Sequence, residues 1–214
     1  MLRILIVDDH SIVRTGLKLL IGTHMPESQI EEASDGVSAL ERIRLHPYDL
    51  AVMDVSMPQT DSFALVSAAL VEDPSLKIIM FSMNSEELYA KRFLKLGAMG
   101  YLSKASPSTE IKRAIEMVLK NRRYISAELS EKLLMEADTK NNTENPFVAL
   151  SQREFEIVQY LLQGASSSEI SRNLSLHSST IATYKARIFD KLKCTNLIEI
   201  SNLAKMYQIN QPAS

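Results

Sequence analysis

Three aspartates, a serine and a lysine stand at or directly after the ends of short apolar runs in the first 105 residues. Asp8 and Asp9 follow RILIV, Asp54 ends LAVMD, Ser82 ends KIIMFS and Lys104 ends GYLSK. Clustered carboxylates repel one another unless a cation lies among them, and an acidic, oxygen-lined pocket suits Mg²⁺. A carboxylate facing Mg²⁺ and a lysine can attack phosphorus and form an acyl phosphate. The metal and Lys104 would then neutralise the transferred group.

These side chains meet only if the elements that carry them bring the strand ends together. Apolar runs alternate with helix-period segments through this region, which predicts an α/β domain with a doubly wound, five-stranded parallel sheet. Ligands of such sheets bind at the carboxyl ends of the strands, near the point where strand order reverses. If the first and third strands are neighbours, the three aspartates converge there. The alternative is that each aspartate caps the following helix, but the matched set at successive strand ends favours a site.

The predicted strands are short, and three of them are almost continuously apolar. They are Arg3–Val7, Gln29–Ala33, Leu50–Asp54, Lys77–Ser82 and Gly100–Lys104. The predicted helices are Ser11–Ile21, Val37–Arg44, Ser62–Val71, Glu86–Leu96 and Pro107–Leu119. Ser106 is expected to cap the last of these, with Pro107 in its first turn.

A polar segment divides the chain into two regions. Ser126–Ala137 predicts one more helix, and Ala137–Pro146 has the composition of a surface linker. We therefore expect a domain over residues 1–124, a helix and linker over 125–147, and a second domain over 148–214. The second domain is predicted to be all-α, with four helices at Ser151–Gln163, Ser167–Leu174, Ser178–Lys193 and Asn196–Tyr207. The short gap between its second and third helices is typical of a helix-turn-helix.

The composition is that of a globular protein. The 214 residues are 45% hydrophobic and 23% charged, which suffices for one or two cores. The net charge is −2, but residues 148–214 are weakly basic, which permits DNA binding. Cys194 is the single cysteine and is expected to be a small buried apolar residue. No apolar stretch approaches the ~20 residues of a membrane span, so we expect a cytoplasmic protein with no membrane partner.

The first region resembles the receiver domain of two-component response regulators, a flavodoxin-like fold. The matching motifs are LIVDDH, MDVSMP, FSMN and GYLSK, and the likeness covers residues 2–122. It implies that Asp54 accepts a phosphoryl group from a cognate histidine kinase. It also implies that Asp8 and Asp9 help to hold Mg²⁺, with Asp9 as the direct ligand beside Asp54 and the backbone carbonyl of Ser56.

The same resemblance assigns the remaining site residues. Lys104 pairs with the phosphoryl oxygens, and Ser82 forms a hydrogen bond to them after transfer. Tyr101 is the aromatic that turns inward when Ser82 moves, or else a half-buried strand tyrosine. His10 is expected to be a local capping or packing residue. The added charge and acceptors of a phosphoryl group would shift the neighbouring surface between two packings.

Three positions depart from the receiver pattern. Ser62 stands where many receivers have glycine, so the loop after Asp54 is expected to be less permissive. Ala105 stands where many have a cis proline, which leaves the isomer of the Lys104–Ala105 bond open. Met83 is bulkier than the usual residue after Ser82 and is expected to slow access of water to the site. None of these changes removes a chemical group from the predicted site.

Leu150–Asn196 resembles the LuxR-type helix-turn-helix of NarL/FixJ-class regulators. The supporting residues are Leu150, Arg153, Glu154, Gly164, Glu169, Ile170, Leu174, Thr180, Ile181, Lys191, Leu192 and Asn196. In the third helix, helical periodicity places Ile181, Tyr184, Ile188 and Leu192 on the inner stripe. The opposite face is then available to DNA.

On that face, Thr183 and Lys185 are expected near base edges in the major groove. The phosphate contacts are expected from Arg187, Lys191 and the hydroxyls of Ser179 and Thr180. The fourth helix carries a stripe of Leu197, Ile200, Ala204 and Tyr207, which either packs into its own domain or joins two copies. The partners expected are double-stranded promoter DNA and, on phosphorylation, a second copy of the chain.

The function that fits these features is a DNA-binding transcriptional response regulator rather than an enzyme. A phosphatase of the haloacid-dehalogenase type needs its second aspartate two residues after the nucleophile, whereas Asp8 and Asp9 are adjacent. A second alternative is a constitutive DNA-binding protein whose receiver serves as a dimerisation scaffold. The intact set of site residues argues against that alternative.

Overall fold

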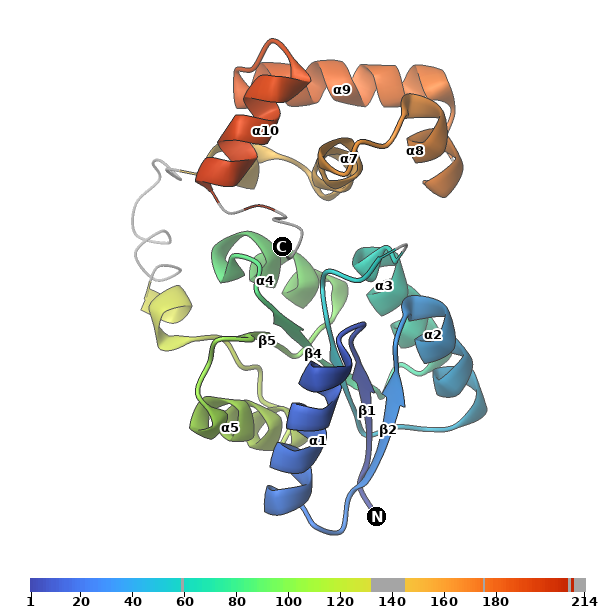
Figure 1. The fold of residues 1–214 in the computed structure, drawn as a ribbon, viewed down its shortest axis with the longest axis vertical. Coiled ribbons are helices and arrows are strands. Elements are labelled where there is room, and N and C mark those ends of the chain that lie inside the picture. The colour runs from blue at the N-terminus through green and yellow to red at the C-terminus, as the bar shows by residue number, and fades with distance from the viewer. Residues whose placement is uncertain (59, 132–144, 175, 208, 210–214) are drawn as a thin grey trace. The chain divides into compact units, whose positions relative to one another are not determined.

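The computed structural model describes residues 1–58, 60–131, 145–174, 176–207 and 209 (Figure 1). Internal contacts divide the chain into two compact units, Met1–Asp138 and Thr139–Ser214. None of the helices in the described ranges is long and apolar enough to cross a membrane. All peptide bonds described are trans, including the one between Lys104 and Ala105.

The first unit is a five-stranded parallel sheet covered by helices on both faces. Its elements are β1 (Arg3–Val7), α1 (Ser11–His24), β2 (Gln29–Ala33), α2 (Gly36–Leu45), β3 (Leu50–Met53), α3 (Ser62–Glu72), β4 (Lys77–Ser82), α4 (Glu86–Leu96), β5 (Gly100–Ser103) and α5 (Ser108–Leu119). The strand order is β2-β1-β3-β4-β5. The predicted fold class is confirmed, and β1 and β3 are indeed neighbours.

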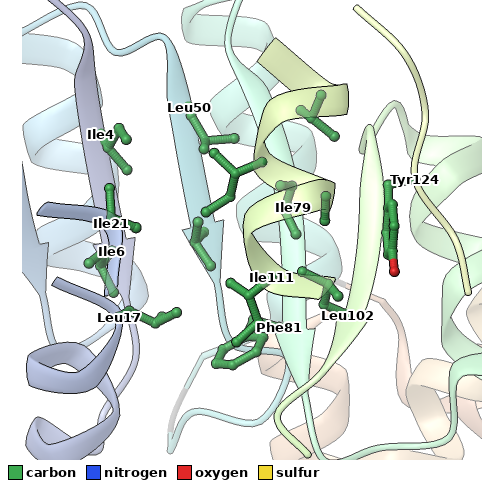
Figure 2. Close-up of a cluster of buried hydrophobic side chains, with 14 residues drawn as sticks. Ile4, Ile6, Leu17, Ile21, Leu50, Ile79, Phe81, Leu102, Ile111 and Tyr124 are labelled. Carbon is green, nitrogen blue, oxygen red and sulfur yellow. The ribbon is translucent and has the colours of Figure 1, made fainter. Parts of the chain in front are cut away.

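The core between the sheet and its α1–α5 face is entirely apolar apart from one tyrosine hydroxyl (Figure 2). Ile4, Ile6 and Val52 of the central strands lie against Leu17 of α1 and Ile115 of α5, each almost fully buried. The strands β1, β3 and β4 are hydrophobic in nearly every position because both faces of the sheet are covered there. This packing fixes the strand ends and, with them, the side chains that follow.

Some predicted boundaries were wrong. The helix α1 continues three residues beyond Ile21, because a glycine such as Gly22 costs only about 1 kcal/mol inside a helix. Pro107 has an extended backbone and is itself the N-cap of α5, so Ser106 is not the capping residue. β3 and β5 each end one residue early, which places Asp54 and Lys104 just after their strands. Of the helix predicted at Ser126–Ala137, residues 127–131 are helical and the rest lies outside the described residues.

The second unit is helical throughout its described part. It consists of a 3₁₀ helix η1 (Pro146–Ala149), α7 (Gln152–Leu162), α8 (Ser167–Asn173), α9 (Ser178–Leu192) and α10 (Leu197–Met206). The helix η1 was not predicted, since its proline suggested a linker. Capping boxes begin α7 and α8, in which Ser151 and Ser166 exchange hydrogen bonds with Glu154 and Glu169. The four predicted helices are confirmed.

Candidate functional site

The residues that follow the strands remain in the hydrogen-bond pattern of the sheet. The amide of Asp8 donates to Ala33 O at 3.2 Å, and that of Asp54 to Val7 O at 2.7 Å. The amide of Lys104 donates to Ser82 O at 2.9 Å. These bonds extend the ladder one residue beyond the strands, so the sheet holds the backbone of the site residues in place.

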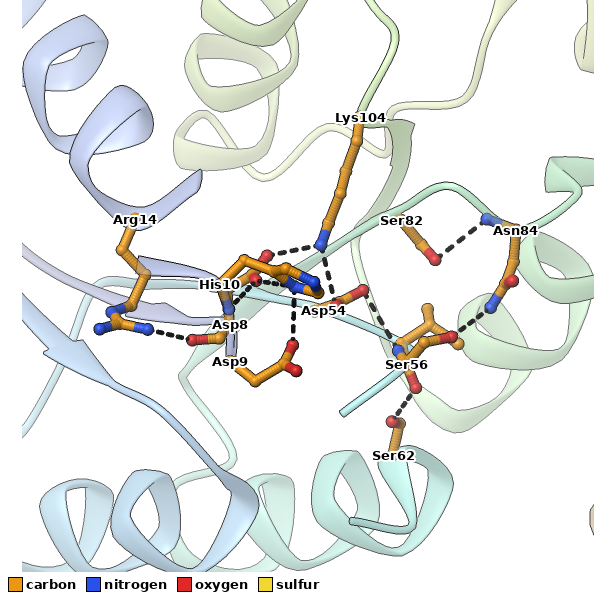
Figure 3. Close-up of polar contacts among 11 residues, drawn as sticks. Asp8, Asp9, His10, Arg14, Asp54, Ser56, Ser62, Ser82, Asn84 and Lys104 are labelled. Atoms are coloured by element: carbon orange, nitrogen blue, oxygen red, sulfur yellow. Dashed lines mark hydrogen bonds and ion pairs between the residues drawn. The ribbon is translucent and has the colours of Figure 1, made fainter. Parts of the chain in front are cut away.

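Two carboxylates and one ammonium form the centre of the site (Figure 3). Lys104 Nζ lies 2.7 Å from Asp8 Oδ2 and 2.9 Å from Asp54 Oδ2. The side chains of both aspartates are almost fully buried, whereas that of Asp9 is about a quarter exposed. Three carboxylates therefore face a single lysine, which leaves the site with an excess of negative charge.

Burial and the ion pairs together set the pKa values of Asp54 and Lys104 at this centre. Burial raises the pKa of Asp54 above its ordinary value, and the charge of Asp8 adds to this, against the opposing hydrogen bond from Lys104. Burial alone would lower the pKa of Lys104, but its hydrogen bonds to Asp8 and Asp54 and their charges raise it. The lysine thus stays protonated, while the ionised form of Asp54 is disfavoured until a further cation compensates it.

The donor set at this centre fits a divalent cation. Asp8, Asp9, His10 and Asp54 each present a ligand atom within 4.8 Å of the others. Asp9 Oδ1 is buried, and its contact among the described residues is with the ring of His10, so it is available as an oxygen ligand. The side chain of His10, the N-cap residue of α1, makes no capping bond, contrary to one of its predicted roles. Its Nδ1 instead lies 2.9 Å from Asp9 Oδ1 and 3.3 Å from Asp8 Oδ1.

The loop after Asp54 is held in place by short polar contacts. The amide of Ser56 donates to Asp54 Oδ1 at 3.2 Å, which places Ser56 beside the carboxylate. The buried hydroxyl of Ser62 donates to the carbonyl of Val55. Since glycine has no such hydroxyl, Ser62 adds a tether to this loop, as its departure from the receiver pattern suggested.

Ser82 and Tyr101 lie in a second set of contacts beside the carboxylates, joined by Asn84. The hydroxyl of Ser82 accepts from the amide of Asn84 at 3.1 Å, and the hydroxyl of Tyr101 donates to the carbonyl of Asn84 at 3.0 Å. The amide group of Asn84 donates to Ser56 Oγ at 2.8 Å. Tyr101 is fully buried, and this burial raises its pKa well above the ordinary value. It is therefore turned inward, not half-buried.

A second candidate surface lies on α9, the longer helix of the helix-turn-helix. Ile181, Ile188 and Leu192 are buried on its inner stripe, and Tyr184 is partly buried. The outer face presents a shallow hollow lined by Ser179, Thr180, Thr183, Tyr184 and Arg187. Arg153 of α7 donates to the carbonyl of Leu174 at 2.6 Å and so holds the turn that precedes α9.

Comparison with known proteins identifies both units. Residues 4–116 match the response regulator receiver domain, and residues 148–204 match the luxR family of bacterial regulatory proteins. The chain belongs to the response regulators. This response regulator is 31% identical to the response regulator UvrY of Escherichia coli K12 over 204 residues, which cover 95% of this chain and 94% of UvrY. It is also 31% identical over 209 residues to the oxygen regulatory protein NreC of Staphylococcus carnosus, covering 95% and 96% of the two chains.

A solved structure supports the fold of the regulator. RcsB from Salmonella enterica serovar Typhimurium, bound to the promoter rprA in the presence of the phosphomimetic BeF3-, aligns with a TM-score of 0.79. The alignment covers 96% of this chain and 99% of RcsB at 23% identity. The predicted family, a receiver followed by a LuxR-type domain, is confirmed.

One residue of the predicted DNA-binding set has an internal contact in the regulator. Lys191 Nζ lies 2.6 Å from Glu154 Oε2 and donates to the carbonyl of Ala149 at 3.3 Å. Glu154 is the glutamate of the α7 capping box, so Lys191 fastens the end of α9 to the start of α7. The structure therefore gives Lys191 a role in the fold, and the predicted phosphate contact has no support from its geometry.

Sequence reasoning also missed residues that shape the receiver site. Asn84 was part of a matching motif but received no role, although it connects Ser56, Ser82 and Tyr101. Arg14 donates to the carbonyl of Asp8 at 2.6 Å and pairs with Glu32 at 3.1 Å. No pattern in a single sequence points to such contacts, because they depend on how the loops and strand ends are placed in the fold.

Proposed function

We propose that this response regulator accepts a phosphoryl group on Asp54 from a histidine kinase and that this controls binding of its LuxR-type domain to promoter DNA. The observation that carries the proposal is the contact of the buried Asp54 carboxylate with Lys104 beside two further aspartates. A buried carboxylate with a raised pKa, next to a lysine and two further carboxylates, is typical of a reactive site.

The chemistry follows from the positions of these groups. A carboxylate oxygen of Asp54 forms a bond to phosphorus while the bond from phosphorus to the kinase histidine breaks, and the released imidazole takes up a proton. Mg²⁺, held by Asp9, Asp54 and the carbonyl of Ser56, would supply electrostatic stabilisation of the transferring group. Lys104 is placed to turn from the carboxylate to the phosphoryl oxygens, and Asp8 holds it within reach.

The response to phosphorylation involves Ser82 and Tyr101. A phosphoryl group brings about −1.5 to −2 charges and three strong acceptors, and Ser82 is the hydroxyl that the receiver resemblance assigns to it. When the Ser82 hydroxyl turns to donate to the phosphoryl group, its contact with the Asn84 amide changes. We expect Tyr101 to respond to that change, because its hydroxyl donates a hydrogen bond to the carbonyl of Asn84.

The DNA-binding proposal rests on the exposed face of α9. The hydroxyl of Thr183 donates back to the carbonyl of Ser179 at 3.1 Å, which leaves its methyl group for contact with a thymine. Lys185 is assigned to base edges, while Ser179, Thr180 and Arg187 are assigned to phosphates. Ile200 and Ala204 of the predicted α10 stripe are buried, but Ile198 and Met206 of the same helix are exposed. These exposed residues support a homodimer that reads two half-sites about 34–36 Å apart.

Two measurements test the function. Incubation with acetyl phosphate and Mg²⁺ is expected to add one phosphoryl group, seen by intact mass spectrometry, and Asp54→Asn is expected to add none. A footprint on the regulator's own promoter is expected to strengthen after this treatment only for the wild type. A wild-type protein that is phosphorylated but binds DNA equally well in both states would favour the scaffold alternative.

The α9 assignment is tested by a matched pair of variants. Arg187→Ala is expected to weaken DNA binding across sequences and to reduce the salt dependence by about one phosphate contact. Lys191→Ala removes an equal charge four residues further along the helix, but from an internal contact. It is expected to leave the salt dependence unchanged. Equal salt dependence in the two variants would contradict the assignment.

A further inference from the structure

The chain that leaves α5 returns to the edge of the sheet. Asn121 has a φ of 58°, a left-handed conformation that asparagine tolerates and that reverses the chain here. The amide of Tyr124 then donates to Met99 O at 2.9 Å, and the amide of Tyr101 donates to Tyr124 O at 3.2 Å. Tyr124 is almost fully buried in the core and pairs in parallel with Gly100 (Figure 2). The start of the linker is therefore part of the receiver.

Two residues later the linker is bound by α4. The amide of Ser126 donates to Glu86 Oε1 at 2.8 Å, in a partly buried contact between residues 40 positions apart. The hydroxyl of Ser126 accepts from the amide of Leu129 at 3.0 Å and so caps the helical residues 127–131. Glu86 lies in the first turn of α4, so this hydrogen bond joins the start of α4 to the start of the helical residues 127–131.

The first turn of α4 directly follows the loop of residues 83–85, which begins after Ser82 of the receiver site. Asn84, two residues before Glu86, is held at its amide by Ser82 and at its carbonyl by Tyr101. The amide of Tyr101 in turn donates to the carbonyl of Tyr124, the residue just before the linker. Hydrogen bonds from β5 and from the first turn of α4, which follows the Ser82 loop, thus both involve the same short stretch of chain, Tyr124 to Ser126.

We infer that Glu86 is a positioning residue that couples the state of the Asp54 site to the linker leading to the DNA-binding domain. The inference rests on the proposed phosphorylation of Asp54. A phosphoryl group on Asp54 draws away the Ser82 hydroxyl, which is the acceptor for the Asn84 amide. The loop from Met83 to Ser85 then rearranges, and the Glu86 carboxylate moves with it. The hydrogen bond to Ser126 changes, and with it the point at which the linker helix begins.

Amide exchange measured by NMR on the full chain tests this coupling. In the wild type, beryllofluoride with Mg²⁺ is expected to alter the exchange rates of both Asn84 and Ser126. Glu86→Ala is expected to speed exchange at Ser126 by about tenfold or more, since one hydrogen bond to a charged group is lost. In that variant, beryllofluoride should change Asn84 alone. Glu86→Gln keeps an acceptor oxygen and is expected to restore the response at Ser126.

Two controls separate the coupling from a general effect on stability. Glu87→Ala removes an equal charge from the same turn of α4, and Ser126→Ala removes the linker cap but keeps the backbone N–H. Both are expected to retain the beryllofluoride response at residue 126. The inference is overturned if Asn84 responds but Ser126 does not, or if Glu86→Ala responds like the wild type. A wild type in which neither residue responds would instead count against phosphorylation at Asp54 itself.

Discussion

Each half of the chain contains a lysine in contact with a nearly buried carboxylate, and the surroundings of the two pairs differ. Lys104 lies between Asp8 and Asp54 with a third carboxylate nearby. Among the described carboxylates, Lys191 contacts that of Glu154. The second pair is balanced in charge, and the backbone amide of Ser151 donates to the glutamate as well. The first pair is left with an excess of carboxylates.

The pKa shifts of the two acids go in opposite directions. Burial raises the pKa of Asp54, and Lys104 does not overcome that effect. Burial also acts to raise the pKa of Glu154, but hydrogen bonds from Lys191 and Ser151 outweigh it and lower the value. A buried carboxylate that remains uncompensated is suited to bind a cation and react, whereas a compensated one stabilises the fold. The comparison thus separates a functional ion pair from a structural one.

The largest expected difference between the two pairs is in stability without metal. Lys104→Ala is expected to lower the free energy of unfolding of the receiver by about 3 kcal/mol, because it leaves buried carboxylates without a cation. Lys191→Ala is expected to cost the second unit about 1 kcal/mol, since that lysine is over a third exposed. Urea titration of the full chain, followed by resolved amide signals from each unit, measures both.

Lys18→Ala is the control for removal of a lysine from an ion pair. Lys18 contacts Glu32 at 3.0 Å on the surface and is about half exposed. We expect a loss below about 0.5 kcal/mol. Equal losses for Lys104→Ala and Lys191→Ala would remove the distinction between the two pairs.

Mg²⁺ is expected to act on one unit only. At about one hundred times its dissociation constant it should stabilise the receiver by about 2.7 kcal/mol and leave the second unit unchanged. Asp9→Asn is expected to lose most of this gain, since it removes one charged carboxylate from the cation site. The same urea titrations with and without Mg²⁺ provide the test. Stabilisation of both units, or none in the wild type, would contradict the account.

The smallest expected effect is a pH dependence in the second unit. The pKa of Glu154 is lowered in the folded state, so its contribution is fully present above its ordinary pKa of 4.5. That contribution is lost as pH falls through the lower folded value. Glu154→Gln is therefore expected to be less stable than the wild type by about 1 kcal/mol at pH 7. The difference should shrink steadily below pH 4.5 in thermal unfolding curves, and a difference that grows there would reverse the assigned sign.

Much of the receiver site could be predicted because it lies at strand ends. The apolar runs define the strands, and parallel strands end at one edge of the sheet, so Asp8 and Asp54 had to converge once β1 and β3 were paired. Lys104 follows β5 at the same edge of the sheet. The tethers around them were not predictable. Asn84 lies in the loop after β4 and Ser62 is the first residue of α3, and their partners depend on backbone positions that no local pattern encodes.

The second unit shows what sequence patterns leave out. Lys191 was predicted to contact DNA because it is a cation near the end of α9. Its direction is set by Glu154, a residue 37 positions earlier, which the sequence showed only as one of the residues that support the LuxR-type resemblance. The predicted helix at Ser151–Gln163 correctly gave the start of α7 but not the lysine that pairs with the Glu154 carboxylate. Long-range ion pairs of this kind become visible only when the helices are packed.

The most direct test of the central claim is to locate the phosphoryl group. After treatment with acetyl phosphate and Mg²⁺, borohydride reduces an aspartyl phosphate to homoserine, which peptide mass spectrometry detects at its position. We predict homoserine at position 54, dependent on Mg²⁺ and absent from Asp54→Asn. Homoserine at position 8 or 9 instead, or no reduction product in a folded wild-type protein, would contradict the account.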